Sequence, residues 1–235
     1  HAGALIGETC AGMVESAIID LSDFGTKAAE RRFMFAFLTG LYRHANNAPV
    51  HLIFDEADMW APERLLDKEG EAAKLLGMME TVVRRGRIKG FIPWLISQRP
   101  AVLSKNVLSQ VDGLVAMKLT SSQDRDALGA WIEGQGDRAK GREILASLPQ
   151  KGRGEGVVWV PGRDLLLGQA KFPTKRTFDS SRTPKRGERT HRAKLAPLDL
   201  PKLRERMATV ESETKANDPK ALKAEIARLK ADATK

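Results

Sequence analysis

Among its 235 residues the sequence has one cysteine, Cys10, and its aromatic residues make up only 6% of the chain. A single cysteine excludes an internal disulfide framework and a zinc site built from cysteines. The neighbours of Cys10 include no histidine or other base placed to activate a thiol. We therefore interpret Cys10 as a plain small residue and not as a nucleophile.

Long hydrophobic runs are also lacking. No stretch of about eighteen apolar residues occurs, and no charged segment followed by an apolar one opens the chain. We therefore predict a cytoplasmic protein that neither crosses nor binds a membrane. Residue 1 is His and the first stretch has the composition of a domain interior, so we expect an N-terminally truncated domain.

Positive charge is unevenly distributed along the chain. The formal net charge is +9, and residues 171–206 carry 12 lysines and arginines against 4 acids. Eight of the nine excess positive charges thus lie in one segment. Such a segment is where contact with a polyanion is expected.

Short apolar runs alternate with helical spacing over the first two thirds of the chain, which predicts an α/β fold with a parallel sheet covered by helices. Residues 50–54 are apolar on both faces, as in a buried parallel strand. Pro93 is awkward within a strand because it lacks an N–H. The expected strands are residues 16–21, 50–54, 90–97 and 113–119, and the expected helices are residues 28–44, 63–86, 102–111 and 122–131.

The composition changes after residue 148, and it predicts three parts in the chain. Apolar residues 157–160 and 165–168 flank a Pro-Gly pair, which predicts an antiparallel β-hairpin at the edge of the sheet. Residues 1–170 then form the core. Residues 171–201 form a basic extended segment, and residues 202–235 form short helices.

Two adjacent acids, Asp55 and Glu56, end the expected strand 50–54. This places both carboxylates at the carboxyl edge of a parallel sheet, where nucleotide sites form. Asp55 would hold Mg²⁺ through its water shell, and Glu56 would orient and deprotonate the water that attacks the γ-phosphate of ATP. The alternative is an ordinary turn in which the acids cap the next helix.

A second polar residue, Gln98, follows the next expected strand. A strand beside the one that ends in the two acids can deliver a polar sensor to the γ-phosphate, and Gln98 fits that role. The alternative is a strand end followed by a turn that Pro100 initiates. The separation from Asp55 and Glu56 by one helix and one strand favours the sensor.

The chain contains five motifs in order, namely Ile53 to Asp58, Arg85 to Gly90, Leu95 to Pro100, Val107 to Gln110, and Leu119 to Asp124. This ordered succession resembles the HerA branch of the HerA/FtsK superfamily over roughly residues 16–170. These proteins are hexameric RecA-like ATPases that move DNA. The resemblance implies ATP and Mg²⁺ as cofactors, a Walker B motif at Asp55 and Glu56, and a sensor at Gln98.

The resemblance also implies an arginine finger that reaches the nucleotide of a neighbouring subunit. Arg87 matches the family's Gly-Arg-Lys pattern best. Ile88 departs from that pattern, since the family tends to have a basic residue there, so Arg85 remains a rival candidate. The alternative for both arginines is a solvated helix end, where the helix dipole favours positive charge.

The phosphate-binding loop, G-x-x-x-x-G-K-[ST], is missing from the sequence. Gly7 and Gly12 have the glycine spacing, but Met13 and Val14 follow, and we interpret the match as chance. In the family this loop precedes the matched segment, so we expect a chain that begins downstream of it. The alternative is a split or degenerate ATPase that depends on a partner. A DEAD-box helicase is similar only in the Asp55-to-Asp58 tetrapeptide.

The basic segment is a candidate DNA contact. Its few aromatic residues favour contact with the phosphate backbone over stacking on bases. The alternatives are a solvated linker and a strap that packs on an acidic neighbour in a ring. The candidate DNA-binding residues are Lys175, Arg176, Arg182, Lys185, Arg186 and Arg189.

The sequence as a whole predicts an ATP-hydrolysing DNA translocase or helicase motor. This chain would be inactive by itself because it lacks the phosphate-binding loop. The expected partners are DNA and further copies of this chain, which would form a ring. The resemblance implies that the ring is a hexamer, and a nuclease is a further candidate partner. The alternative is a non-catalytic DNA-binding or ring-assembly subunit with a degenerate or split ATPase fold.

Overall fold

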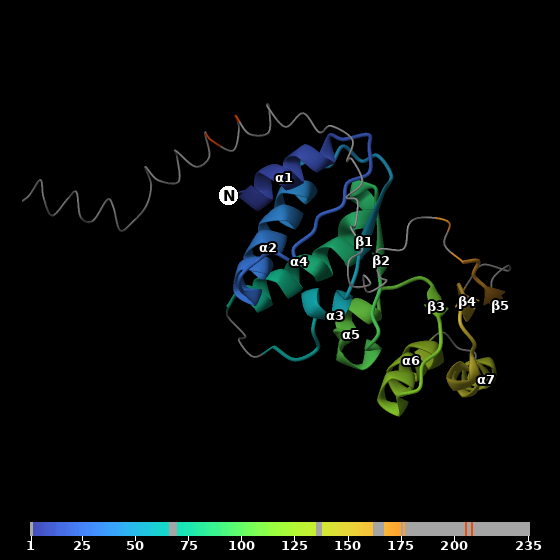
Figure 1. Cartoon of the computed structure of the whole chain (residues 1–235). Helices are drawn as coiled ribbons and strands as arrows, with labels where there is room; N and C mark the ends of the chain where they lie inside the picture. Colours follow the sequence, from blue (N-terminus) through green and yellow to red (C-terminus); the bar gives the residue numbers. More distant parts are fainter. Residues whose placement is uncertain are drawn as a thin grey trace, which may run out of the picture.

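The computed structural model shows two sheets with helices packed against them (Figure 1). It describes residues 2–65, 70–134, 138–161 and 167–174, together with Arg176, Glu205 and Ala208. The elements are α1 (Ala2–Ala11), α2 (Lys27–His44), β1 (Val50–Phe54), α3 (Ala57–Trp60), α4 (Glu71–Arg85), η1 (Gly86–Lys89), β2 (Phe91–Leu95), η2 (Pro100–Val102), α5 (Lys105–Leu108), β3 (Leu114–Ala116), α6 (Ser122–Gly134), α7 (Arg138–Ser147), η3 (Leu148–Gln150), β4 (Glu155–Trp159) and β5 (Leu167–Lys171).

The first sheet contains β1 and β2, which run parallel. Val50 pairs with Phe91 at the amino edge, and Phe54 pairs with Leu95 at the carboxyl edge. The strand expected at residues 50–54 is confirmed with the same bounds, and β2 lies inside the range expected for it. The parallel arrangement brings the residues that follow both strands to one edge.

A capping residue, Thr26, starts α2, and a turn residue, Gly90, sets the starts of β1 and β2 side by side. The Thr26 hydroxyl accepts a hydrogen bond from the Ala29 N–H at 3.2 Å, which caps α2. Gly90 has φ +81°, and a Cβ there would lie 2.2 Å from the Ala48 carbonyl oxygen. Only glycine combines this left-handed backbone with so close an approach, so Gly90 keeps the start of β2 next to the start of β1.

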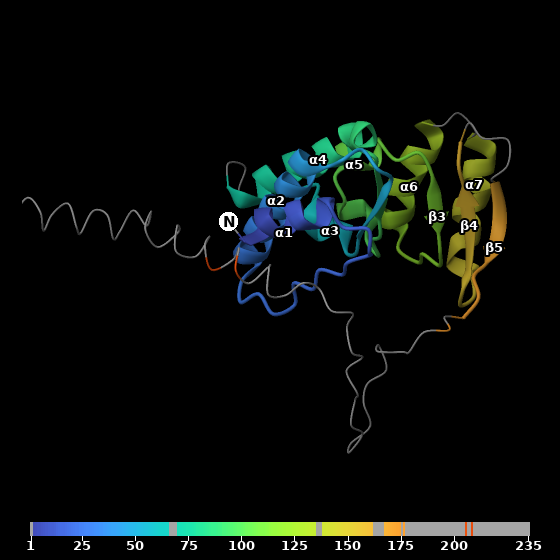
Figure 2. The same ribbon diagram turned by 90° about the horizontal axis from the view of Figure 1, so that it is seen from above.

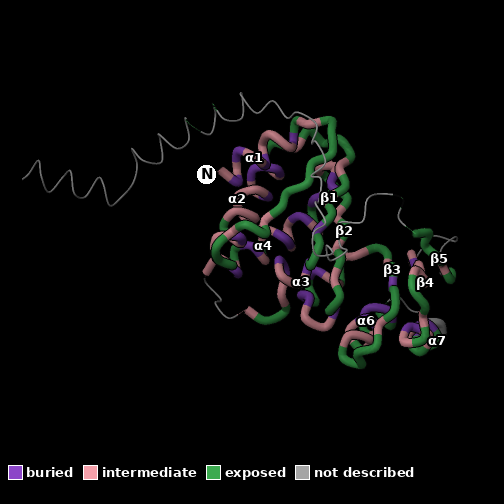
Figure 3. Tube along the Cα trace, in the orientation of Figure 1, coloured by how far each residue is buried: buried purple, intermediate pink, exposed green. Residues whose placement is uncertain are grey.

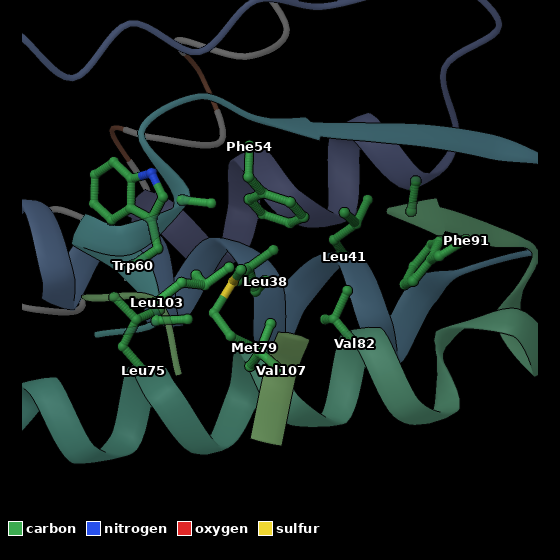
Figure 4. Packing of buried hydrophobic residues seen from close by; sticks show 13 residues of the cluster. Leu38, Leu41, Phe54, Trp60, Leu75, Met79, Val82, Phe91, Leu103 and Val107 are labelled. Carbon is green, nitrogen blue, oxygen red and sulfur yellow. The ribbon is translucent and has the colours of Figure 1, made fainter. Parts of the chain in front are cut away.

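The core beneath the first sheet is built on α4, whose apolar residues recur at helical spacing. Its buried side chains Leu75, Met79 and Val82 face Leu38 and Leu41 of α2 (Figure 4). Strands β1 and β2 cover this cluster from one side. The helix expected at residues 63–86 is confirmed in its second part, α4, while residues 66–69 lie outside the described structure.

Pro93 is accommodated without loss to the first sheet. The Ile96 N–H donates to the Phe54 carbonyl of β1 at 3.0 Å. Successive backbone amides of a strand point to alternate edges, so Pro93, three residues earlier, has its missing N–H on the edge away from β1. This is the position in a sheet where proline is tolerated.

The second sheet has the order β3-β4-β5 and is antiparallel throughout. The expected hairpin is confirmed, since Trp159 of β4 pairs with Leu167 of β5. It pairs with β3 and not with the parallel strands. The second sheet lies with α6 and α7 at one end of the molecule, and α1, α2 and α4 lie at the other (Figure 2).

Helix α1 packs along α2 through glycines. A Cβ on Gly7 would lie 2.1 Å from the Phe37 carbonyl oxygen, and one on Gly40 would lie 2.2 Å from the Ala4 carbonyl oxygen. Gly7 therefore serves the contact between two helices and lies in no phosphate-binding loop.

Other features differ from expectation. Residues 16–21 form no strand, residues 63–65 are not helical, and the helix expected at residues 102–111 is reduced to η2 and α5. The strand expected at residues 113–119 is β3, which lies in the antiparallel second sheet and not in the parallel one. No pattern was recognised for the helices α1 and α7.

Candidate functional site

The structure brings Asp55, Glu56 and Gln98 to one edge of the first sheet. Asp55 and Glu56 directly follow β1, and Gln98 lies three residues after β2. The Ala57 N–H donates to the Ile96 carbonyl at 2.8 Å, which ties the two segments together beyond the paired strands. All three candidate side chains belong to exposed residues. The edge therefore presents two carboxylates and one amide to solvent.

Glu56 has an unusual backbone conformation. It lies in the left-handed region with φ 49° and ψ 48°, directly before α3. Placing a non-glycine residue there costs about 1–2 kcal/mol. Strain of this kind gathers at functional sites, where the surrounding contacts hold it in place. The turn sends the chain sharply from β1 into α3, so the two acids occupy the turn itself.

Hydrogen bonds fix the backbone around the two acids. The Trp60 Nε1–H donates to the Asp55 carbonyl at 2.9 Å, and the Glu56 N–H donates to Asp55 Oδ1 at 3.0 Å. The Met59 N–H donates to the Glu56 carbonyl at 2.8 Å. These bonds use the main chain of Glu56, and its carboxylate makes no capping bond to α3.

Asp58 links the two halves of the site, although no role was assigned to it from the sequence. The Ser97 hydroxyl donates to Asp58 Oδ1 at 2.6 Å and accepts the Arg99 N–H at 3.0 Å. These two bonds hold the turn on either side of Gln98. The sequence does place the carboxylate of Asp58 shortly after the two acids and the hydroxyl of Ser97 just before Gln98. Only the folded structure shows that these two side chains form a hydrogen bond.

Arg85 and Arg87 lie away from this edge. Arg85 ends α4 and Arg87 lies in η1, immediately before the amino end of β2. The five residues of β2, at roughly 3.3 Å each, separate them from Gln98 by about 16 Å along the sheet. Both arginines are exposed, and neither has an ion-pair partner within the described residues. The structure does not bring them to the site of their own chain.

One face of the first sheet is open to solvent. Alternate residues of β1 and β2 point away from the helices, and Figure 3 shows exposed positions along both strands. We call this the bare face. The relative exposure is 67% for Ile53, 41% for Ile92, 49% for Trp94 and 49% for Ile96. His51 completes it, with its Nδ1 accepting the Trp94 Nε1–H at 2.8 Å.

Most of the candidate DNA contacts lie outside the described residues, namely Lys175, Arg182, Lys185, Arg186 and Arg189. Arg176 is described and is exposed. The short helices expected at residues 202–235 also lie outside, apart from Glu205 and Ala208.

Three further observations concern the described part of the chain. It contains no group of three His, Cys, Asp or Glu residues able to hold a metal ion between them. None of its helices combines the length and apolar character needed to cross a bilayer. Burial raises the pKa of the Cys10 thiol, which packs against the first core and is thus poorly suited to act as a thiolate.

Two curated proteins are similar to this chain. The DNA double-strand break repair helicase HerA of Pyrococcus furiosus is 26% identical over 110 residues, which is 47% of this chain and 18% of that protein. The "Probable helicase MJECL08" of Methanocaldococcus jannaschii is 26% identical over 144 residues, 61% of this chain and 26% of that protein. The chain therefore spans about a fifth to a quarter of these relatives.

The chain matches no protein-family profile. Among solved structures, the genome packaging NTPase B204 of Sulfolobus turreted icosahedral virus 2 in complex with ATP-gammaS is similar, with TM-score 0.49 and 11% identity over 74% of this chain and 72% of that one. The same NTPase with AMPPCP gives TM-score 0.46 and 14% identity over 61% and 66%. The curated relatives support a relationship to HerA/FtsK-type P-loop ATPases, at low identity.

Proposed function

We propose that this chain carries the hydrolytic edge of an ATP-driven DNA motor. The observation that supports it best is the meeting of Asp55, Glu56 and Gln98 at the carboxyl edge of two parallel strands. Nucleotides bind at this edge in open α/β sheets. The relatives add weight, because one is named a DNA repair helicase and the other a probable helicase.

The three side chains divide the chemistry of phosphoryl transfer. Asp55 would hold a hydrated Mg²⁺, which would supply positive charge to stabilise the phosphates, and Glu56 would orient the attacking water and accept its proton. Gln98 would contact the γ-phosphate as a sensor. Each of these groups is exposed, as a group must be to meet a nucleotide and its metal.

Arg85 or Arg87 serves a neighbouring subunit in this proposal. Since both lie at the opposite edge of the sheet from Glu56, they do not reach the nucleotide of their own chain. A ring of subunits stacked head to tail would present them to the next site, where an arginine stabilises the charge of the transition state. The basic segment around Arg182 and Lys185 would lie along the DNA backbone.

The decisive test is ATP hydrolysis in the assembled protein that includes a phosphate-binding loop. The Glu56→Gln variant is expected to lower kcat by about 10²–10⁴-fold, the usual contribution of a general base. Its affinity for ATP should change little. Glu133→Gln, an exposed acid on α6, is the matched control. Unchanged turnover in Glu56→Gln would remove Glu56 from this role.

A second candidate function is a non-catalytic DNA-binding or ring-assembly subunit. The observation that suits it is the positive charge of residues 171–206, which carry 12 lysines and arginines against 4 acids. Salt titration separates the DNA part from catalysis. Binding through phosphates should weaken steeply with salt, by a slope of about 0.9 per phosphate contact. Binding that held constant as salt rose would contradict a phosphate contact in either function.

A further inference from the structure

The loop that carries Gln98 is anchored at both ends, while Gln98 itself is exposed. At the first end the Ser97 hydroxyl donates to Asp58 Oδ1 at 2.6 Å. At the second end the Ala101 N–H donates to Asp124 Oδ1 at 3.0 Å. This second acceptor belongs to α6 and lies 23 residues further along the chain. The loop therefore depends on an element outside the first sheet.

The bond to Asp124 satisfies a backbone donor at the start of η2. Pro100 opens this short helix and has no N–H, so Ala101 provides its first amide donor. The first N–H groups of a helix have no partner within the helix. The Asp124 carboxylate supplies that partner, and a charged acceptor makes a stronger hydrogen bond than a neutral one. The bond thus holds the chain three residues after Gln98.

The start of α6 holds Asp124 itself in a defined position. The Ser121 hydroxyl accepts the Asp124 N–H at 3.3 Å, which caps the helix. Arg125 Nη1 donates to the Thr120 carbonyl at 2.5 Å and ties the helix to the segment that follows β3. Further along α6, the side chain of Ile132 is fully buried in the second core. A carboxylate on so firmly held a helix offers its oxygen at a fixed place.

We propose that Asp124 is a positioning residue, which fixes Gln98 from the second end of its loop. The inference rests on the proposed function, because Asp124 has this purpose only if Gln98 contacts the γ-phosphate. It deepens that function by adding a residue from a helix of the second core. Asp124 acts through the backbone of Ala101 and not by contact with the nucleotide.

A site residue on a loop needs support of this kind. Misplacing a reacting or sensing group by about 1 Å can cost about 100-fold in rate. Gln98 and Arg99 are both exposed, so no packing of their own side chains holds the loop. The hydrogen bonds at Ser97 and Ala101 supply the restraint that packing does not.

The test measures ATP hydrolysis by the assembled protein that includes a phosphate-binding loop. Asp124→Ala removes the acceptor of the Ala101 N–H and should lower kcat about 10–100-fold, while KM for ATP changes little. Asp124→Asn loses the charge but keeps an acceptor oxygen, so it should restore most of kcat. Asp126→Ala is the matched control, since Asp126 is an exposed acid on the same helix.

A double-mutant cycle with Gln98→Ala shows whether Asp124 acts through Gln98. If it does, Asp124→Ala should lower kcat no further once the Gln98 amide is absent. A role confined to the stability of η2 predicts that the two losses multiply. Multiplying losses, or an Asp124→Asn variant no more active than Asp124→Ala, would overturn the inference.

Hydrogen exchange in the same protein gives a readout that does not depend on ATP turnover. Asp124→Ala should speed exchange over residues 97–102, while the interior of α6 and strand β1 keep their protection. Asp124→Asn should leave residues 97–102 protected. Unchanged exchange over residues 97–102 in Asp124→Ala would contradict the anchoring of the loop by Asp124.

These results separate the inference from the proposed function. If Glu56→Gln slows turnover while Asp124→Ala leaves both kcat and exchange unchanged, the proposed function stands and the role of Asp124 fails. If Glu56→Gln leaves turnover unchanged, the proposed function fails. Faster exchange over residues 97–102 in Asp124→Ala alone would then still support Asp124 as the residue that holds this loop.

Discussion

Both sheets of this molecule are covered by helices on one face only, but this one-sided cover has a different significance in each sheet. Each is covered by helices on one face and exposes apolar residues on the other, Ile53 and Trp94 in the first sheet and Val115 and Met117 in the second. The second sheet is antiparallel, a type that tolerates a solvated face. The first is parallel, a type that does not. One-sided cover is therefore ordinary in one sheet and incomplete in the other.

The candidate site residues are also unevenly distributed between the two sheets. The candidate residues Asp55, Glu56 and Gln98 all follow strands of the first sheet. The second sheet is closed by a core in which Trp131 and Trp159 meet edge to face at 5.9 Å. The first sheet thus carries these three residues, and the second sheet carries none of them.

Core truncation is the largest expected effect and tests whether the sheets have separate cores. Met79→Ala under the first sheet and Ile132→Ala under the second each remove a fully buried side chain. Each should cost about 2–5 kcal/mol of unfolding free energy. Hydrogen exchange should accelerate mainly in β1 and β2 for Met79→Ala, and mainly in β3, β4 and β5 for Ile132→Ala. Equal acceleration in both sheets would break the comparison.

A smaller effect is expected from the helices that cover the first sheet. Gly7→Ala forces a methyl group against the Phe37 carbonyl, and such overpacking should cost about 1–3 kcal/mol. Gly77→Ala on α4 is the matched control, since nothing lies within 4 Å of its added Cβ. It should stabilise the protein by about 0.5–1 kcal/mol. Urea unfolding measures both, and equal signs would contradict the helix contact at Gly7.

The smallest expected effect concerns the link that Asp58 makes across the candidate site. Asp58→Ala removes the acceptor of the Ser97 hydroxyl and should cost about 1 kcal/mol. Asp58→Asn keeps an acceptor oxygen and should cost less. A double-mutant cycle with Ser97→Ala measures the coupling. Additive effects in that cycle would show that the bond does not hold the Gln98 turn.

The sequence predicts the parallel strands and the hairpin well because their signals are local. Residues 50–54 form a short apolar run ended by two acids, and Pro161 with Gly162 marks the turn region of the hairpin. The false strand at residues 16–21 has the same local pattern. No strand pairs with it in the described structure, and Ile18 remains 95% exposed. Strand propensity decides only when a neighbour supplies the hydrogen bonds.

The sequence allowed us to predict which residues form the candidate site, but not the hydrogen bonds that hold the site together. The positions of Asp55, Glu56 and Gln98 follow from strand ends alone. The bond between Asp58 and Ser97 depends on how α3 leaves the sheet, which no local pattern encodes. The interpretation of the Gly7 and Gly12 spacing as chance agrees with the structure, because Gly7 packs against the backbone of α2 at Phe37.

The left-handed backbone of Glu56 makes glutamate a poor choice for folding stability at this position. Glycine, asparagine or aspartate adopts that conformation more easily than glutamate. Glu56→Gly would relieve about 1–2 kcal/mol of backbone strain. Under the proposed function, a glutamate at this position trades some stability for activity. This strain fits the role that we propose for the Glu56 carboxylate.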